Sequence, residues 1–265
     1  MTERFALQFS IAGLLVCAGI LLYMQLTRSS AVTGLIASMA FGATALATLT
    51  SLGGSSPLIF VFFVLLLLLS VLTRGNPITN VGYVFSASKT AWIVAVLLIY
   101  AVVGSLLFPR LFAGKASVFV SSRETGHVYE TVLAPTSGNI TQTGYLVLGG
   151  LCFFAVLILM TRYRSIEDIK RGFFLMCGLH ATMGMIDLIA KYAGAGDVLG
   201  FIRSANYALL TEASEAGLPR VVGAFPEASS FGAASLACLA FTYTYWREAG
   251  SRAAFWLSAV LFILV

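Results

Sequence analysis

The stretch from Arg220 to Gly232 combines residue types that could bind an anion at the start of a helix. It reads Arg-Val-Val-Gly-Ala-Phe-Pro-Glu-Ala-Ser-Ser-Phe-Gly. Pro226 suits the first turn of a helix, where its missing N–H costs nothing. The free N–H groups of such a turn and the planar donor fork of Arg220 fit the oxygens of a diphosphate. Glu227 could cap this helix, position Arg220 or act as a base toward a sugar hydroxyl.

Two simpler interpretations of this stretch stay open. Arg220 and Glu227 could form an ion pair that only caps the helix. The residues that follow, from Ala228 to Ala237 and including Ser229, are mostly small. Small residues let a second helix approach closely, and they equally let a lipid-linked ligand approach.

A second group of polar residues lies just upstream. His180, Gly184, Asp187 and Lys191 follow one another at helical spacing and therefore share one stripe. Asp187 and Lys191 can pair across one turn. Ionisable groups on such a stripe should face the bundle interior or a wet cavity. They could line the same cavity as Arg220, or they could be a neutral histidine and a self-contained ion pair at a helix end.

The connection 193–226 carries the remaining candidates for substrate binding, which are Arg203, Asn206 and Tyr207. Residues 204–216 predict a short interfacial helix that stops at Gly217. Residues 193–227 hold two basic and four acidic residues, a net charge of −2. An anionic ligand would therefore have to be met by individually placed groups, because the overall field does not attract it.

Composition indicates that most of the surface faces lipid. The chain has 265 residues, of which 59% are hydrophobic and 10% are charged, whereas soluble domains carry roughly 25% charged residues. There is no basic run that would indicate nucleic acid. The four cysteines show no C-x-x-C spacing, and no metal-ligand cluster or cofactor fingerprint is present. We therefore expect no metal and no cofactor.

Apolar segments of about 20 residues predict membrane-spanning helices. We expect an all-α polytopic membrane protein in which residues 1–265 form a single domain of seven full spans and a partial eighth. Because the eighth begins near residue 253 and the chain stops at Val265, we expect a fragment. The seven full spans are predicted at 5–26, 31–50, 56–73, 90–108, 144–161, 172–192 and 227–246.

Basic residues predict which connections are cytoplasmic. They crowd residues 162–171 and flank the connections after the third and seventh spans. The long connections 109–143 and 193–226 then lie outside, as does the amino terminus. If spans two and three formed one re-entrant element, the terminus would move inside. Within 109–143, Pro109 should end the fourth span, and two β-prone runs between residues 117 and 133 predict a hairpin.

The run from Arg220 to Gly232, preceded by Asn206-Tyr-Ala, resembles the O-antigen polymerase and ligase superfamily. Two weaker segments, 108–114 and 137–142, resemble its exopolysaccharide-polymerase branch. The resemblance implies a GT-C-like glycosyltransferase in the bacterial inner membrane, which transfers a glycan from undecaprenyl diphosphate to an acceptor glycan at the periplasmic face. It further implies that Arg220 holds the diphosphate and that Glu227 is the acidic residue of the motif.

The same resemblance implies the partners: the undecaprenyl-diphosphate-linked glycan, the acceptor glycan, the bilayer and polysaccharide-assembly proteins. Two other classes of function stay open. The stripe of His180, Asp187 and Lys191 would also suit a transporter or flippase of a lipid-linked or ionic solute. The small-residue stretch after Glu227 would also suit a non-catalytic assembly subunit.

Overall fold

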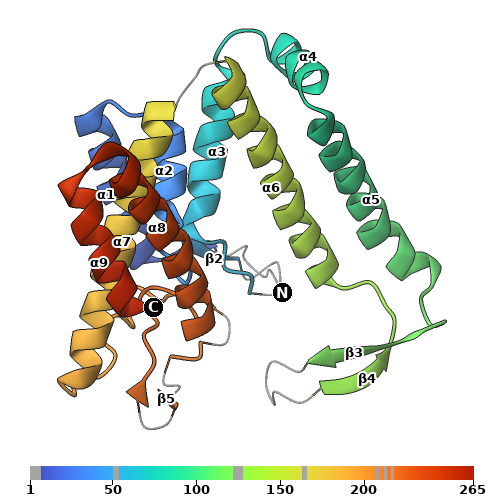
Figure 1. The fold of residues 1–265 in the computed structure, drawn as a ribbon. Helices are drawn as coiled ribbons and strands as arrows, with labels where there is room; N and C mark the ends of the chain where they lie inside the picture. The colour runs from blue at the N-terminus through green and yellow to red at the C-terminus, as the bar shows by residue number, and fades with distance from the viewer. Residues whose placement is uncertain are drawn as a thin grey trace. The chain divides into compact units, whose positions relative to one another are not determined.

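In the computed structural model the chain is mostly helical, and short two-stranded ribbons connect some of the helices (Figure 1). The structure describes residues 7–49, 54–121, 128–162, 166–206, 209–211, 214–215 and 218–265. The helices are α1 (Ile11–Thr27), α2 (Ala31–Ser38), α3 (Ile59–Leu72), α4 (Pro77–Ala87), α5 (Lys89–Leu111), α6 (Ser137–Arg162), α7 (Ile166–Tyr192), α8 (Ala228–Ala249) and α9 (Arg252–Leu264). The strands are β1 (Leu7–Phe9), β2 (Ala47–Leu49), β3 (Ser117–Ser121), β4 (Val128–Val132), β5 (Ser214–Glu215) and β6 (Leu218–Pro219).

The helices are those of a membrane protein, but fewer of them are long enough to span than the sequence predicts. Among the described residues, α5, α6 and α7 are long and apolar enough to cross a bilayer. The pair α3 and α4, bent by 103°, adds a fourth crossing if it is one span. The expected seven full spans are therefore not found among the described residues. Helix α1 has 17 residues and α2 only eight, and α8, although 22 residues long, is not apolar enough to count as a span.

The predicted span at 31–50 is helical only as far as Ser38. Beyond it the chain turns and then pairs as β2 with β1. Hydropathy did not reveal this break because the residues stay apolar while their backbone groups bond elsewhere. The N–H of Ala43 donates to the carbonyl of Ala224 at 2.9 Å, and that of Leu46 donates to Pro57 at 2.8 Å. Irregular backbone is tolerated among apolar helices when protein groups satisfy it in this way.

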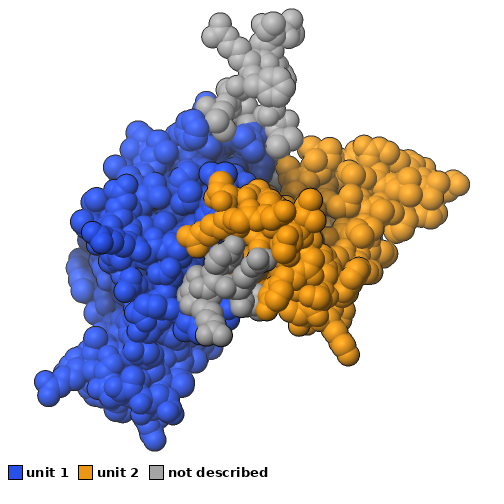
Figure 2. Space-filling model, turned by 90° about the horizontal axis from the view of Figure 1, so that it is seen from above, with its two compact units in different colours: residues 1–70, 159–265 blue, residues 71–158 orange. Residues whose placement is uncertain are grey.

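The chain divides into two compact units, residues 1–70 with 159–265 and residues 71–158, drawn in blue and orange in Figure 2. In the first unit α7 packs against α2, α8 and α9, and α1 packs against α2. Close approach depends on glycines: a Cβ on Gly34 of α2 would lie 2.6 Å from the ring of Phe63. Phe63 and Phe231 are almost completely buried. In a bilayer such packing, rather than exclusion of water, holds helices together.

The beginning of α7 holds the turn between α1 and α2. The Asp168 carbonyl accepts the hydroxyl of Thr33 at 2.8 Å, and its carboxylate accepts the N–H of Ser30 at 3.3 Å. Arg171 donates to the carbonyl of Thr27 at 3.1 Å. Because Thr27 is the last residue of α1, this cation lies at the negative end of the helix dipole.

The second unit contains α4, α5, most of α6 and the predicted hairpin. Strands β3 and β4 pair antiparallel, with Phe119 opposite Glu130, which confirms the ribbon. Pro109 lies inside α5 instead of ending the helix. It sits in the last turn, where its missing N–H removes only one hydrogen bond. Helix α4 is a finding that the sequence did not predict, since residues 74–89 were expected to be a connection.

The connection from α7 to α8 does not contain the expected helix over 204–216 in its described part. Residues 214–215 and 218–219 pair as the strands β5 and β6. Before them the backbone bonds to distant segments: the N–H of Ala205 donates to Ala43 at 3.0 Å, and that of Leu210 donates to Pro226 at 2.8 Å. These tertiary hydrogen bonds take the place of the helical ones.

Candidate functional site

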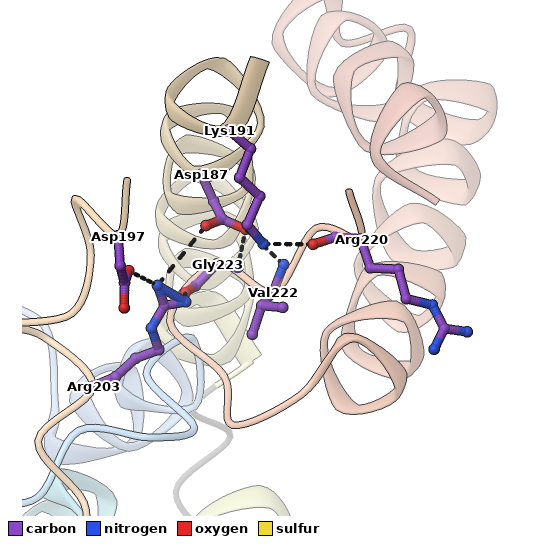
Figure 3. Close-up of polar contacts among 7 residues, drawn as sticks. All are labelled: Asp187, Lys191, Asp197, Arg203, Arg220, Val222 and Gly223. Carbon is purple, nitrogen blue, oxygen red and sulfur yellow. Dashed lines mark hydrogen bonds and ion pairs between the residues drawn. The ribbon is translucent and has the colours of Figure 1, made fainter. Parts of the chain in front are cut away.

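The predicted ion pair between Asp187 and Lys191 forms, at 3.0 Å, near the end of α7. It belongs to a larger group of residues that we call the Asp187 cluster. The cluster consists of the side chains of Asp187, Lys191, Asp197 and Arg203 and the backbone of residues 220–223 (Figure 3). Its side chains come from α7 and from the connection that follows it.

Asp187 is the centre of this cluster. Its Oδ2 atom accepts the N–H of Val222 at 2.7 Å and the N–H of Gly223 at 3.2 Å, in addition to the Lys191 ammonium. Only 3% of Asp187 is exposed. A buried carboxylate is costly unless it is paired and hydrogen-bonded, and here both conditions hold. Asp187 therefore fixes the loop that leads from Arg220 to α8.

Arg203 completes the cluster from the opposite side. Its Nη1 donates to the carbonyl of Gly223 at 2.9 Å, and its Nη2 pairs with Asp197 and lies 3.9 Å from the Oδ1 of Asp187. The Arg203 side chain is 1% exposed, and its Nε is a buried donor without a hydrogen-bond partner in the described structure. The cluster contains two carboxylates and two cations, so its formal charges balance.

Local geometry explains why the loop accepts this arrangement. Gly223 has a φ of +56°, a left-handed conformation that glycine adopts without strain. A Cβ at this position would lie 2.8 Å from the ring of Phe231. Gly223 can therefore turn the chain between Asp187 and α8 while Phe231 packs directly behind it.

His180 lies deeper along the same stripe of α7 and does not take part in the Asp187 cluster's hydrogen bonds. It is 1% exposed, and its Nε2 shares a hydrogen bond of 2.7 Å with the hydroxyl of Ser235 on α8. The imidazole stacks on Phe231, with ring centroids 4.4 Å apart, and meets Phe225 edge-on. This histidine therefore helps to pack α7 against α8.

Arg220 contributes its backbone to the cluster, while its side chain points elsewhere. Its carbonyl accepts a hydrogen bond from Lys191. Figure 3 shows the guanidinium directed away from Asp187, and the residue is exposed. The cluster thus holds the main chain at Arg220 and leaves the orientation of the guanidinium to other contacts.

Helix α8 starts within two residues of the expected place, but Pro226 lies before the helix and not in its first turn. Glu227 is its N-cap residue, one position after Pro226. The Glu227 carboxylate makes no cap to a backbone N–H; it accepts the hydroxyls of Ser229 and Ser230 instead. The first-turn N–H groups, which carry the positive end of the helix dipole, are consequently not occupied by this side chain.

The remaining predicted residues of the site lie in the connection. Asn206 is exposed, and its N–H donates to the hydroxyl of Ser56 at 2.9 Å. Tyr207 lies outside the described residues. An apolar cavity of about 290 Å³ lies between α1 and α7 and contains none of the predicted site residues; it is lined by Val16, Gly19, Ile20, Tyr23, Phe41, Leu175 and Leu179.

The sequence predicted that the stripe of His180, Asp187 and Lys191 faces the bundle interior or a wet cavity; His180 and Asp187 are buried and Lys191 is half-buried. The sequence did not connect Asp197 and Arg203 to this stripe. An Asp and an Arg six residues apart in a connection carry no helical spacing signal. The role of the Val222 and Gly223 N–H groups was equally out of reach, because backbone donors look the same at every position. The turn glycine within the motif was the one available signal.

Comparison with family models, with curated proteins and with solved structures found no match for this chain. The fold and the site define a helical membrane protein in which a charge-balanced cluster around the buried Asp187 and Arg203 anchors an arginine-bearing loop at the start of a helix.

Proposed function

We propose that this chain belongs to a bacterial surface polysaccharide polymerase or ligase, which transfers a glycan from undecaprenyl diphosphate to an acceptor glycan. The observation that carries the proposal is the anchored loop: exposed Arg220 sits on a backbone fixed by the Asp187 cluster. The loop leads directly to α8, whose first-turn N–H groups Glu227 leaves uncapped. A guanidinium and a helix N-terminus are both suited to a diphosphate.

In the proposed reaction an acceptor hydroxyl attacks the anomeric carbon of the lipid-linked sugar. The new glycosidic bond forms as the bond from that carbon to the diphosphate oxygen breaks. The leaving undecaprenyl diphosphate gains negative charge, which Arg220 and the start of α8 would stabilise. Glu227 would accept the proton of the attacking hydroxyl, since its carboxylate already accepts hydroxyl donors from Ser229 and Ser230.

Several finer expectations belong to this proposal. They are a GT-C-like architecture, a location in the bacterial inner membrane, and a periplasmic position for 109–143 and 193–226. The apolar cavity between α1 and α7 offers a place for part of an isoprenoid chain. Ser229 would contact substrate as an exposed residue of the first turn, and Asn206 and Tyr207 would contribute from the connection.

The test is replacement of Arg220 by alanine in the protein expressed in its native bacterium. We expect chain extension to fall by about 100-fold or more, as on removal of a group that stabilises developing charge. The amount of protein in the membrane should stay unchanged. Arg220→Lys should recover only part of the activity, because lysine lacks the planar fork. Arg247→Ala, an exposed arginine in the last turn of α8, is the matched control. Normal long-chain glycan from Arg220→Ala would refute the assignment.

A second candidate, a transporter or flippase, is favoured by one specific observation. Helix α2 ends after eight residues and continues as buried irregular chain, as in the discontinuous helices of transporters. Flux of a lipid-linked or ionic solute in proteoliposomes tests it. If Arg220→Ala leaves that flux intact while wild-type protein extends no glycan in the same vesicles, transport is the better explanation.

A further inference from the structure

Helix α4 is a short amphipathic helix in the second unit. It runs from Pro77 to Ala87, and the side chain of Asn76 caps it by accepting the N–H of Ile78 at 2.9 Å. Only Ser88, in an extended conformation, separates it from the membrane-spanning helix α5. Because Asn76 caps its start and Ser88 its end, α4 is a separate helix and not a continuation of α5.

The surface of α4 is divided into three faces. Asn80 and Val84, one turn apart, are each 1% exposed and form the face that packs against protein. Ile78 is 82% exposed and Val81 51% exposed, and they form an exposed apolar face. Thr79 and Ser86 are exposed and polar. At about 3.6 residues per turn, these three pairs point in well-separated directions.

The charges around α4 are of one sign. Arg74 precedes the helix and Lys89 follows it. There is no Asp or Glu anywhere between Arg4 and Arg123. The formal charges in this part of the sequence are therefore all positive, and a positively charged segment complements an anionic surface.

A tryptophan near the start of α5 contacts α4 and is itself exposed. The Nε1 of Trp92 donates to the carbonyl of Phe85 at 3.0 Å, and the two rings lie 4.7 Å apart. In one straight helix, residues seven apart would be separated by about 10 Å along the axis, so this contact requires a bend. Trp92 is nevertheless 59% exposed. Indoles with a satisfied N–H and a free apolar edge are typical of the membrane–water interface.

We propose that α4 lies in the plane of the membrane interface and binds anionic lipid headgroups. Ile78 and Val81 enter the boundary of the acyl chains, Thr79 and Ser86 face water, and Arg74 and Lys89 contact the headgroups. This is the arrangement by which amphipathic helices bind membrane surfaces, and a basic pair beside a spanning helix favours anionic lipid. The proposal is independent of the proposed enzymatic function.

The experiment places an environment-sensitive fluorophore on a cysteine at position 78 or 86 in the full chain. Ile78→Cys tests the apolar face, and Ser86→Cys is the matched control on the polar face. The protein without an introduced cysteine, treated with the same fluorophore, corrects for labelling of the native cysteines. In vesicles of phosphatidylcholine and phosphatidylglycerol, we expect the probe at residue 78 to be quenched by nitroxide lipids at least threefold more than the probe at residue 86.

The lipid charge provides the second arm. Replacing both Arg74 and Lys89 by glutamine should reduce quenching at residue 78 in the anionic vesicles and leave it unchanged in vesicles of phosphatidylcholine alone. Equal quenching at residues 78 and 86 would overturn the interfacial position. Shielding of residue 78 in detergent, with cross-links between copies at that position, would show that a second copy covers the face and would also overturn the proposal. If quenching at residue 78 is the same in both kinds of vesicle and is unchanged when Arg74 and Lys89 are both replaced by glutamine, α4 does not bind anionic headgroups.

Discussion

The carboxylate of Asp187 on α7 accepts the backbone N–H of Val222 at 2.7 Å, across 35 residues of sequence. This hydrogen bond joins the end of one helix to the loop that starts the next. A charged acceptor makes stronger hydrogen bonds than a neutral one, and burial of Asp187 keeps water from competing. The position of the Arg220 main chain therefore depends on a residue that never touches a ligand in the proposed mechanism.

Replacing Asp187 by asparagine should destabilise the protein strongly. The change leaves the buried Arg203 and the half-buried Lys191 with one carboxylate fewer, and breaking a buried charge network costs about 3–5 kcal/mol. We expect a lower thermal-unfolding midpoint in detergent and faster hydrogen exchange at the amides of Val222 and Gly223. Glu130→Gln, on the exposed hairpin, is the control. Unchanged exchange at both amides would show that Asp187 does not anchor the loop.

Alanine substitutions at Gly223 and Gly250 compare two sources of strain, the left-handed backbone conformation and a steric clash of the new Cβ. Both have positive φ, +56° and +63°, but a Cβ meets Phe231 at 2.8 Å at Gly223 and nothing within 4 Å at Gly250. Gly250→Ala should cost about 1 kcal/mol from the backbone conformation alone. Gly223→Ala should cost about 1–3 kcal/mol more, because the ring must also move. Equal shifts of the unfolding midpoint for the two variants would contradict the close packing of Phe231.

Ser235→Ala tests the hydrogen bond that joins α7 to α8. The serine hydroxyl shares a bond of 2.7 Å with the buried imidazole of His180, and its removal leaves a buried ring nitrogen unsatisfied. We expect a loss of about 1–3 kcal/mol. Ser258→Ala is the matched control, since that hydroxyl donates only to the Phe255 carbonyl of its own helix. If chemical denaturation shows the same loss for both serines, the interhelical bond contributes nothing.

The number of spans shows where sequence reasoning failed. Residues 31–50 are as apolar as those of a spanning helix, yet the chain leaves the helix after Ser38. The N–H of Ala43 donates to Ala224, a residue 181 positions away. Hydropathy sums the preference of side chains for lipid, and it does not register which partner a backbone N–H finds. Helix α2 therefore ends where its backbone finds tertiary hydrogen-bond partners, and the amino-acid composition of the segment does not indicate this end.

The sequence by itself determined the helical membrane class, the hairpin at 117–133, the pairing of Asp187 with Lys191 and the start of α8 beside Pro226. Each of these follows from local spacing: apolar length, β-prone runs around a turn, one helical turn, or a proline at a helix start. Only the tertiary structure decided that Asp187 holds the backbone of the Arg220 loop and that Arg203 joins it. Those contacts connect groups far apart in sequence, and their energy depends on burial that exists only once the helices have packed.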